Sequence, residues 1–174
     1  MSRVKIQIED GIAEVLLNRP EKRNGLDVEM FEAIVAAGVR LQTEPGLRAV
    51  VLHGAGASFC AGLDFKAFMA GPAEVQAVLL ARTEGQPANV AQRVSWVWRE
   101  VPVPVICAIH GHCFGGGLQI ALGADIRYAR PDAQLSVMEM KWGLIPDMGI
   151  TKTLPPLVGL DVAQELAPTA KGLD

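Results

Sequence analysis

Three consecutive glycines, Gly115, Gly116 and Gly117, stand between an apolar segment and a stretch that reads as a helix. Backbone N–H groups at the start of a helix have no intrahelical acceptor, carry the positive end of the helix dipole, and at glycine are not shielded by a Cβ. Such a turn suits a negative group, either a bound anion or an oxyanion that forms during a reaction. Glycines that only allow a helix to pack closely on a strand are the alternative.

The known phosphate-binding registers do not fit this cluster. A dinucleotide fingerprint needs the spacing G-x-G-x-x-G, but Gly111 is followed by His112 and Cys113. A P-loop needs Lys and then Ser or Thr after its last glycine, and the chain has Gly117 and Leu118 there. The pattern therefore disfavours a phosphate cradle.

A second loop, residues 58–66 (SFCAGLDFK), also follows a predicted buried strand and opens a predicted helix. Two strand ends that each present free N–H groups near a glycine can converge on one oxygen atom. An oxyanion hole requires two such donors. An ordinary turn is the alternative interpretation of this loop.

Two acids, Glu139 and Asp147, stand eight residues apart in an otherwise apolar stretch, SVMEMKWGLIPDMG. Acids in apolar surroundings are usually paired or functional. A carboxylate held there can have a raised pKa and move protons near neutral pH. The alternative for each is a solvated or salt-bridged surface acid.

Other reactive residue types show weaker patterns. Ser58 and Ser136 lack the G-x-S-x-G motif and an evident His/Asp partner. The histidines have no spacing suited to a metal, so no metal site is expected: His53, His110 and His112. The three cysteines lack ligand spacing and are predicted to be reduced, mostly buried thiols: Cys60, Cys107 and Cys113.

The elements that must position these groups alternate between strands and helices. Strands are predicted over 4–8, 13–17, 49–52, 105–109, 126–129 and 134–136, with a hairpin turn at Asp10-Gly11. Helices are predicted from an Asp27 cap to about Gln42, over 63–69, within 74–100 with an interruption at 85–87, after the glycines, partly within 148–158, and from an Asp161 cap to about Leu166. The first helix should bury one face: Met30, Phe31, Ile34, Val35 and Val39. The helix after the glycines should be amphipathic.

This order indicates one α/β domain over residues 1–174, with strands that return through helical crossovers. The composition, 50% hydrophobic and 20% charged, is globular, and a net charge of −3 gives no general attraction to nucleic acid or membrane. No apolar run reaches the length of a membrane helix, and no signal peptide is evident. A cytoplasmic protein is expected. The last predicted helix has no further packing element after it, so a C-terminal part is expected to be absent or truncated.

Four segments together resemble the enoyl-CoA hydratase/isomerase (crotonase) superfamily, in the family's order and spacing. They are 18–24 (NRPEKRN), 59–66 (FCAGLDFK), 110–117 (HGHCFGGG) and 124–127 (ADIR). The resemblance implies an α/β spiral of ββα units. It also implies a C-terminal helical domain used for trimer formation, which this chain stops short of. A homotrimer or hexamer is expected if that domain is present in the native protein.

The resemblance also implies residue roles. The N–H groups of Leu63 and Gly116 would hold the thioester oxygen of an acyl-CoA, with coenzyme A entering as part of the substrate and no separate cofactor. The CoA moiety would be contacted by Arg23, Ala61, Asp64 and Lys66. Glu139 matches one of the two glutamates of the family's hydratases, whereas Gln119 stands where the second would be, and Gln cannot accept a proton. Asp147 matches a position used by the family's dienoyl-CoA isomerases.

The sequence therefore favours an acyl-CoA enzyme that stabilises an enolate and shifts a double bond with Glu139 and Asp147. A 2-enoyl-CoA hydratase in which Glu139 acts largely alone is the first alternative. A non-catalytic acyl-CoA-binding protein is the second. A serine hydrolase on the same spiral fold, as in Clp proteases, is disfavoured by the missing Ser/His/Asp set.

Overall fold

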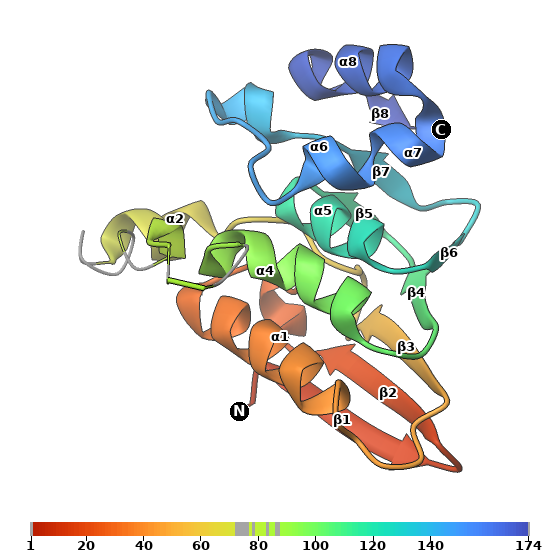
Figure 1. Cartoon of the computed structure of the whole chain (residues 1–174). Helices are drawn as coiled ribbons and strands as arrows, with labels where there is room; N and C mark the ends of the chain where they lie inside the picture. The colour runs from red at the N-terminus through yellow and green to blue at the C-terminus, as the bar shows by residue number, and fades with distance from the viewer. Residues whose placement is uncertain (1, 72–76, 78, 83, 86–87, 174) are drawn as a thin grey trace.

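The computed structural model describes residues 2–71, 77, 79–82, 84–85 and 88–173. Its elements follow one another in space much as they do along the chain, from the N-terminal hairpin at one end of the molecule to the C-terminal helices at the other (Figure 1). Neighbouring layers are therefore made of neighbouring stretches of sequence. The predicted α/β class is confirmed.

The larger sheet has five strands in the order β1-β2-β3-β4-β6. Strands β1 and β2 form the predicted antiparallel hairpin, in which Asp10 and Gly11 both have positive φ, as a two-residue type I′ turn requires. The other neighbours pair in parallel. The strands are β1 (Val4–Glu9), β2 (Ile12–Leu17), β3 (Ala49–Gly54), β4 (Val105–Ile109) and β6 (Ile126–Ala129).

Helices α1 (Val28–Leu41) and α4 (Val90–Trp96) cover one face of this sheet (Figure 1). The Asp27 side chain accepts a hydrogen bond from the Met30 N–H and so caps α1 as predicted. The predicted burial of Val39 is wrong, since its side chain is 45% exposed. The α1 backbone meets α4 and the short helix η2 (Val97–Glu100) instead through Gly38, whose missing Cβ makes room for Val97. The prediction of helix over 74–100 is confirmed only for 90–100, because several residues of 72–87 lie outside the described ones.

Helix α5 (Gly116–Gly123) follows the glycine turn and a short strand β5 (His112–Phe114) that the sequence analysis missed. The prediction that this helix is amphipathic is wrong, because all eight of its residues are buried. It packs between α4 and α6 (Ile150–Thr153), so no side of it faces water. Gly123 is one reason it fits, since a Cβ there would collide with the Ser95 carbonyl.

The C-terminal layer contains a three-stranded sheet, β5-β7-β8, and a group of short helices. The predicted Asp161 cap is wrong: Gly159 is the N-cap, Asp161 lies in the first turn, and the helix runs past Leu166. None of the helices in the described ranges is long and apolar enough to cross a membrane. The remaining elements are η1 (Pro20–Lys22), α2 (Phe65–Ala70), β7 (Gln134–Ser136), η3 (Glu139–Trp142), α7 (Pro155–Val158), α8 (Leu160–Thr169) and β8 (Gly172–Leu173).

Candidate active site

Two loops meet at the carboxyl edge of the large sheet. Strands β3 and β4 are parallel neighbours, so the loops that follow them leave the sheet at the same edge. Hydrogen bonds then tie these loops together: the Cys60 N–H donates to His112 O at 3.0 Å and the Phe114 N–H donates to Cys60 O at 3.0 Å. The loop that ends at Leu63 therefore lies beside the glycine turn.

Each loop carries a backbone donor for which the described residues provide no acceptor. The Leu26 N–H donates to Gly62 O and the Asp64 N–H donates to Leu26 O, so the N–H of Leu63 between them points away from Leu26. Gly116 is the first residue of α5, where no intrahelical acceptor exists. Within the described residues, neither the Leu63 N–H nor the Gly116 N–H donates a hydrogen bond.

Glycine allows the two donors to come close. At Gly62, which has φ of +88°, a Cβ would lie 2.7 Å from Phe114 O and 3.6 Å from the Gly116 nitrogen. At Gly117 a Cβ would lie 2.4 Å from Cys60 O. No side chain fits between the loops at these points, so the Leu63 and Gly116 donors share one small region.

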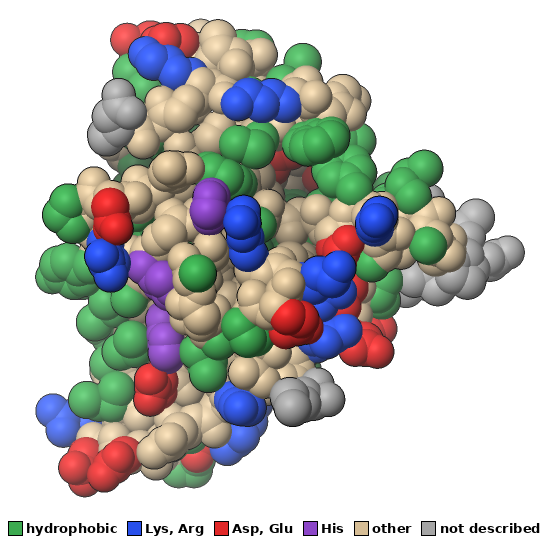
Figure 2. All heavy atoms as spheres, turned by 180° about the vertical axis from the view of Figure 1, so that it is seen from behind, with side chains coloured by type: hydrophobic (Ala, Val, Ile, Leu, Met, Phe, Trp, Pro, Cys, Tyr) green, Lys and Arg blue, Asp and Glu red, His purple; other side chains and the backbone are tan. Residues whose placement is uncertain are grey.

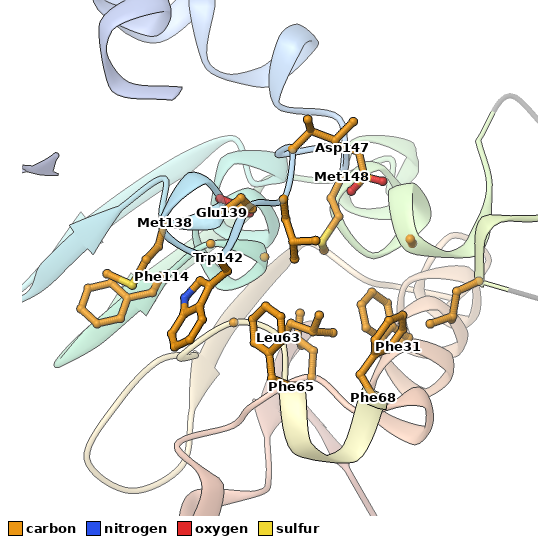
Figure 3. Close-up of a pocket in the computed structure, with 18 of the residues that line it drawn as sticks. Phe31, Leu63, Phe65, Phe68, Phe114, Met138, Glu139, Trp142, Asp147 and Met148 are labelled. Carbon is orange, nitrogen blue, oxygen red and sulfur yellow. The ribbon is translucent and has the colours of Figure 1, made fainter. Parts of the chain in front are cut away.

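The donors open into a cavity of about 450 Å³. Leu63, Gly116, Glu139 and Asp147 all line it, so the four residues predicted to be catalytic lie around one space. In Figure 3, Glu139 and Asp147 lie along one side of the cavity, and Phe31, Phe65 and Phe68 lie opposite. The rest of the described lining is apolar or glycine: Leu26, Phe31, Ala61, Gly62, Phe65, Phe68, Leu79, Leu80, Ala91, Phe114, Gly115, Met138, Trp142, Leu144, Ile145 and Met148.

Glu139, at the start of η3, is held by Gln119. The Gln119 Nε2 donates to Glu139 Oε1 at 2.7 Å, and Gln119 is only 1% exposed. The other two oxygens of this pair, Gln119 Oε1 and Glu139 Oε2, are buried and have no hydrogen-bond partner among the described residues. The amide therefore orients the carboxylate and leaves Oε2 without a hydrogen-bond partner.

The environment raises the pKa of Glu139. Burial is the largest cause, because it penalises the charged carboxylate, and the negative charge of Asp147 acts in the same direction. The backbone N–H of Glu139 and the Gln119 amide act against this but do not outweigh it. A carboxyl group whose pKa is moved toward neutrality is suited to accept a proton and return it. Asp147 itself is exposed, at the edge of the cavity.

Of the four residues predicted to contact CoA, Ala61, Asp64 and Lys66 belong to the loop that carries Leu63, and Arg23 follows η1. Arg23 and Lys66 are exposed, and the Arg23 carbonyl accepts the Ala61 N–H at 3.0 Å. Asp64 is already engaged, since it caps α2 and pairs with Arg19 at 2.9 Å. Burial alone would raise the pKa of Asp64, but hydrogen bonds from the Ala67 N–H and Arg19, with the positive charge of Arg19, hold it below its ordinary value.

The sequence analysis missed two buried residues that position the loops. Asn24 is fully buried, and its Nδ2 lies within hydrogen-bond distance of the carbonyls of Ala55, Ser58 and Phe59. The sequence did contain a signal for this role: Asn24 is a polar residue of a type that favours turns, and it lies in the charged segment 18–24.

Arg19, 8% exposed, pairs with both helix caps, Asp27 of α1 at 3.4 Å and Asp64 of α2 at 2.9 Å. It also donates to Gly25 O. This one guanidinium therefore ties the first helix to the segment that carries Leu63.

A serine nucleophile finds little support. Ser58 Oγ lies 2.9 Å from His112 Nδ1, but Ser58 is fully buried, and no carboxylate hydrogen-bonds His112 within the described residues.

The cysteines are buried free thiols, as predicted, and burial raises the pKa of Cys60 to about 12. Figure 2 shows the face that carries the three histidines; Lys and Arg side chains there lie among acidic ones.

Solved structures share this fold over nearly the whole chain. A Thermobifida fusca enoyl-CoA hydratase homologue in complex with acetoacetyl-CoA superimposes with a TM-score of 0.85 at 30% identity, covering 99% of this chain and 68% of the other. The architecture is thus the α/β crotonase fold. A profile of the enoyl-CoA hydratase/isomerase family matches residues 7–174, and the chain belongs to that family.

Curated relatives with different reactions are about equally similar. (E)-benzylidenesuccinyl-CoA hydratase of Thauera aromatica is 35% identical over 169 residues, 97% of this chain and 62% of the relative. The human mitochondrial Delta(3,5)-Delta(2,4)-dienoyl-CoA isomerase is 33% identical over 164 residues, 92% of this chain and 50% of the relative. The chain thus spans half to about three fifths of their length. Similarity alone does not separate hydration from isomerisation, nor does it fix the cellular compartment.

Proposed function

We propose that this protein is an acyl-CoA isomerase that shifts a double bond of an enoyl- or dienoyl-CoA. The observation that carries the proposal is the arrangement around the cavity: two unpaired N–H groups, Leu63 and Gly116, lie beside a single oriented base, Glu139. The neighbouring residue Gln119 supplies a hydrogen-bond donor to that base and cannot itself take a proton.

The proposed reaction moves one proton and no other atom. The thioester oxygen accepts hydrogen bonds from the Leu63 and Gly116 N–H groups, which stabilise the negative charge of the enolate; one such donor is worth roughly 2.7–4 kcal/mol in an acyl-transfer oxyanion hole. Glu139 Oε2 removes a proton from carbon, and the electron pair passes into the conjugated system. Glu139, now protonated, returns the proton to another carbon and completes the shift; where Asp147, on the same side of the cavity, is the donor instead, the proton held by Glu139 passes to Asp147 afterwards.

The CoA part of the substrate is assigned to the outer side of the loops. Arg23 and Lys66 are exposed cations suited to its phosphates, and Ala61, whose N–H is engaged by Arg23 O, lines the cavity and offers its carbonyl. The Asp64 carboxylate is committed to Arg19 and to the α2 cap, and its N–H and carbonyl bond Leu26 and Phe68, so a contact from Asp64 to CoA would share one of these groups. We also propose that the protein is cytoplasmic and that it forms a homotrimer or hexamer where the native protein carries the C-terminal helical domain; cell fractionation and sedimentation test these two points.

The activity is tested by offering two thioesters separately. A 3,5-dienoyl-CoA should give a 2,4-dienoyl-CoA of unchanged mass, whose conjugation is followed by ultraviolet absorbance. A 2-enoyl-CoA should give little of the 3-hydroxyacyl-CoA, which is heavier by one water. Rapid hydration with no isomerisation would reject the isomerase.

One observation favours 2-enoyl-CoA hydration as a second candidate. Gln119 Oε1 and Glu139 Oε2 are both buried acceptors without a donor. A water molecule that donates one O–H to Glu139 Oε2 would satisfy that acceptor and could present a lone pair to the substrate. In that reaction Glu139 alone would move protons, so the Gln119 variants described below separate the candidates. Tight binding of thioesters without any product would instead favour a non-catalytic acyl-CoA-binding protein.

A further inference from the structure

Aromatic residues are scarce in this chain but gather at one place. The sequence has five Phe, three Trp and one Tyr. Five of these nine residues line the candidate active-site cavity, from four different elements (Figure 3). They are Phe31, Phe65, Phe68, Phe114 and Trp142.

These rings are not simply part of the core. Phe59 and Trp98, which are core residues, are fully buried. Of the cavity rings only Phe31 is buried, whereas Trp142 is 62% exposed and the other three are half-buried. Leaving large apolar rings uncovered costs free energy unless a ligand covers them, so exposed aromatic surface that lines a cavity marks a binding site.

The rings are also arranged so that another ring can join them. Phe65 and Trp142 lie with centroids 5.0 Å apart and planes tilted by 35°, which is a normal aromatic pair. In Figure 3 Leu63 and Phe65 lie between Trp142 and the pair Phe31 and Phe68, so the rings follow one another along the same wall of the cavity. The side chains of Met138 and Met148 on the cavity wall add polarisable sulfur, which also contacts aromatic rings favourably.

We propose that the acyl group of the substrate carries an aromatic ring, so that the ligand class is an aryl-substituted acyl-CoA. This inference rests on the proposed function, because it takes the cavity to be the acyl site. Among the described lining side chains only Glu139 and Asp147 are charged, and both lie on one side. The ring is therefore one without polar substituents, placed against the aromatic wall with the thioester at Leu63 and Gly116.

The test compares two unreactive thioesters with equal numbers of acyl carbons. Both 3-phenylpropanoyl-CoA and nonanoyl-CoA have nine, and neither has a double bond to hydrate or shift. The CoA moiety is identical in the two esters, so a difference between their Kd values, measured by calorimetry, is caused by the acyl group. Apolar area alone favours the longer nonanoyl chain. We expect instead that the phenyl ester binds about tenfold more tightly, a factor that one to two ring pairs supply.

Ring-removing variants assign the preference to the wall. Phe68→Leu and Trp142→Leu keep an apolar side chain and should each reduce the preference for the phenyl ester severalfold. Tyr128→Leu is the matched control, because Tyr128 is an aromatic residue, 67% exposed, on β6 and outside this cavity. It should leave both Kd values unchanged. Thermal unfolding of each variant confirms that it is folded.

The outcomes separate this inference from the proposed function. Equal binding of the two esters, or tighter binding of nonanoyl-CoA, overturns the aryl assignment and leaves the acyl-CoA function standing. A preference that survives in both Phe68→Leu and Trp142→Leu overturns it as well. If neither ester binds more tightly than free CoA, the proposed function itself fails.

Discussion

The side-chain amide of Gln119 holds one oxygen of Glu139 at 2.7 Å, from a position where it is 99% removed from solvent. The carboxylate is thereby fixed, and its second oxygen is left without a partner at the cavity. A fixed carboxylate with one unpaired oxygen can act as a base that accepts and releases a proton at that single atom. The predictions below test that arrangement and the loops that support it.

Glu139→Gln should lower kcat by about 10²–10⁴, the usual contribution of a positioned general base, with little change in substrate affinity. Glutamine keeps the size of the side chain, so the cavity should stay intact. Steady-state kinetics and a separate Kd for a saturated thioester distinguish the two effects. A wild-type kcat in this variant would exclude Glu139 as the base.

Asp147→Asn should lower the pKa of Glu139, because the negative charge of Asp147 is one of the causes that raise it. The acid limb of the pH–rate profile reports ionised Glu139 and should therefore move to lower pH. Since the variant is also expected to turn over slowly, ¹³C NMR of the Glu139 carboxyl provides a direct titration. Glu165→Gln, an exposed acid on α8, is the control. An unchanged or raised pKa in Asp147→Asn contradicts the coupling.

Wild-type protein should lose stability relative to Glu139→Gln as pH rises. The pKa of Glu139 is raised in the folded state, so between the unfolded value and the folded value the native protein binds more protons than the unfolded chain. Stability then falls with increasing pH across that window and stays lower above it. Denaturant unfolding of both proteins at several pH values gives the difference. A difference that grows in favour of wild type at higher pH would contradict the burial of this charge.

Gln119→Leu should raise the pKa of Glu139, because the amide hydrogen bond acts to lower it. The acid limb of the pH–rate profile should move to higher pH, whereas a purely structural role would lower the rate without moving the limb. Gln119→Glu addresses the reaction instead: it adds a second carboxylate beside Glu139 and should increase hydration of a 2-enoyl-CoA. If hydration is already fast in the wild type and is lost in Gln119→Leu, the hydratase candidate is favoured.

Arg19→Met should lower the free energy of unfolding by roughly 1–3 kcal/mol, because it leaves Asp64 without its cation, whereas Asp27 keeps its ion pair with Arg3 at 2.6 Å. Both Asp27 and Asp64 would lose their shared cation. Arg130→Met is the matched control, because Arg130 and Asp132 are about two-thirds exposed and such pairs contribute about 0–1 kcal/mol. Similar losses in the two variants would show that the Arg19 pairing is not important.

Local patterns along the chain were sufficient to predict much of the fold. The bounds of the two hairpin strands and of β4, β6 and β7 were predicted within a residue or two, because short apolar runs bounded by turn residues are typical of strands. The Asp27 cap was found because its chemistry is local. The family, and with it the spiral fold, followed from four motifs and is confirmed by the comparisons.

The errors arise where distant contacts decide the outcome. Helix α5 is buried on every side only because α4 and α6 enclose it, and its own sequence does not contain that information. Val39 is exposed because Gly38 makes the close approach to Val97. The Gln119–Glu139 hydrogen bond spans 20 residues, so the sequence could identify the missing second acid but not the amide that orients the remaining one. The catalytic and CoA-binding roles stay predictions.

The paired loops have a consequence for cooperativity. The donor at Leu63 follows β3 and the donor at Gly116 follows β4 and β5, and hydrogen bonds from the Cys60 and Phe114 N–H groups join the two segments. Separating these segments would break both hydrogen bonds and would move the Leu63 and Gly116 donors apart in one event. Hydrogen exchange at Cys60 and Phe114 should therefore occur with one common opening free energy, and that quantity would set the fraction of molecules ready to receive a thioester.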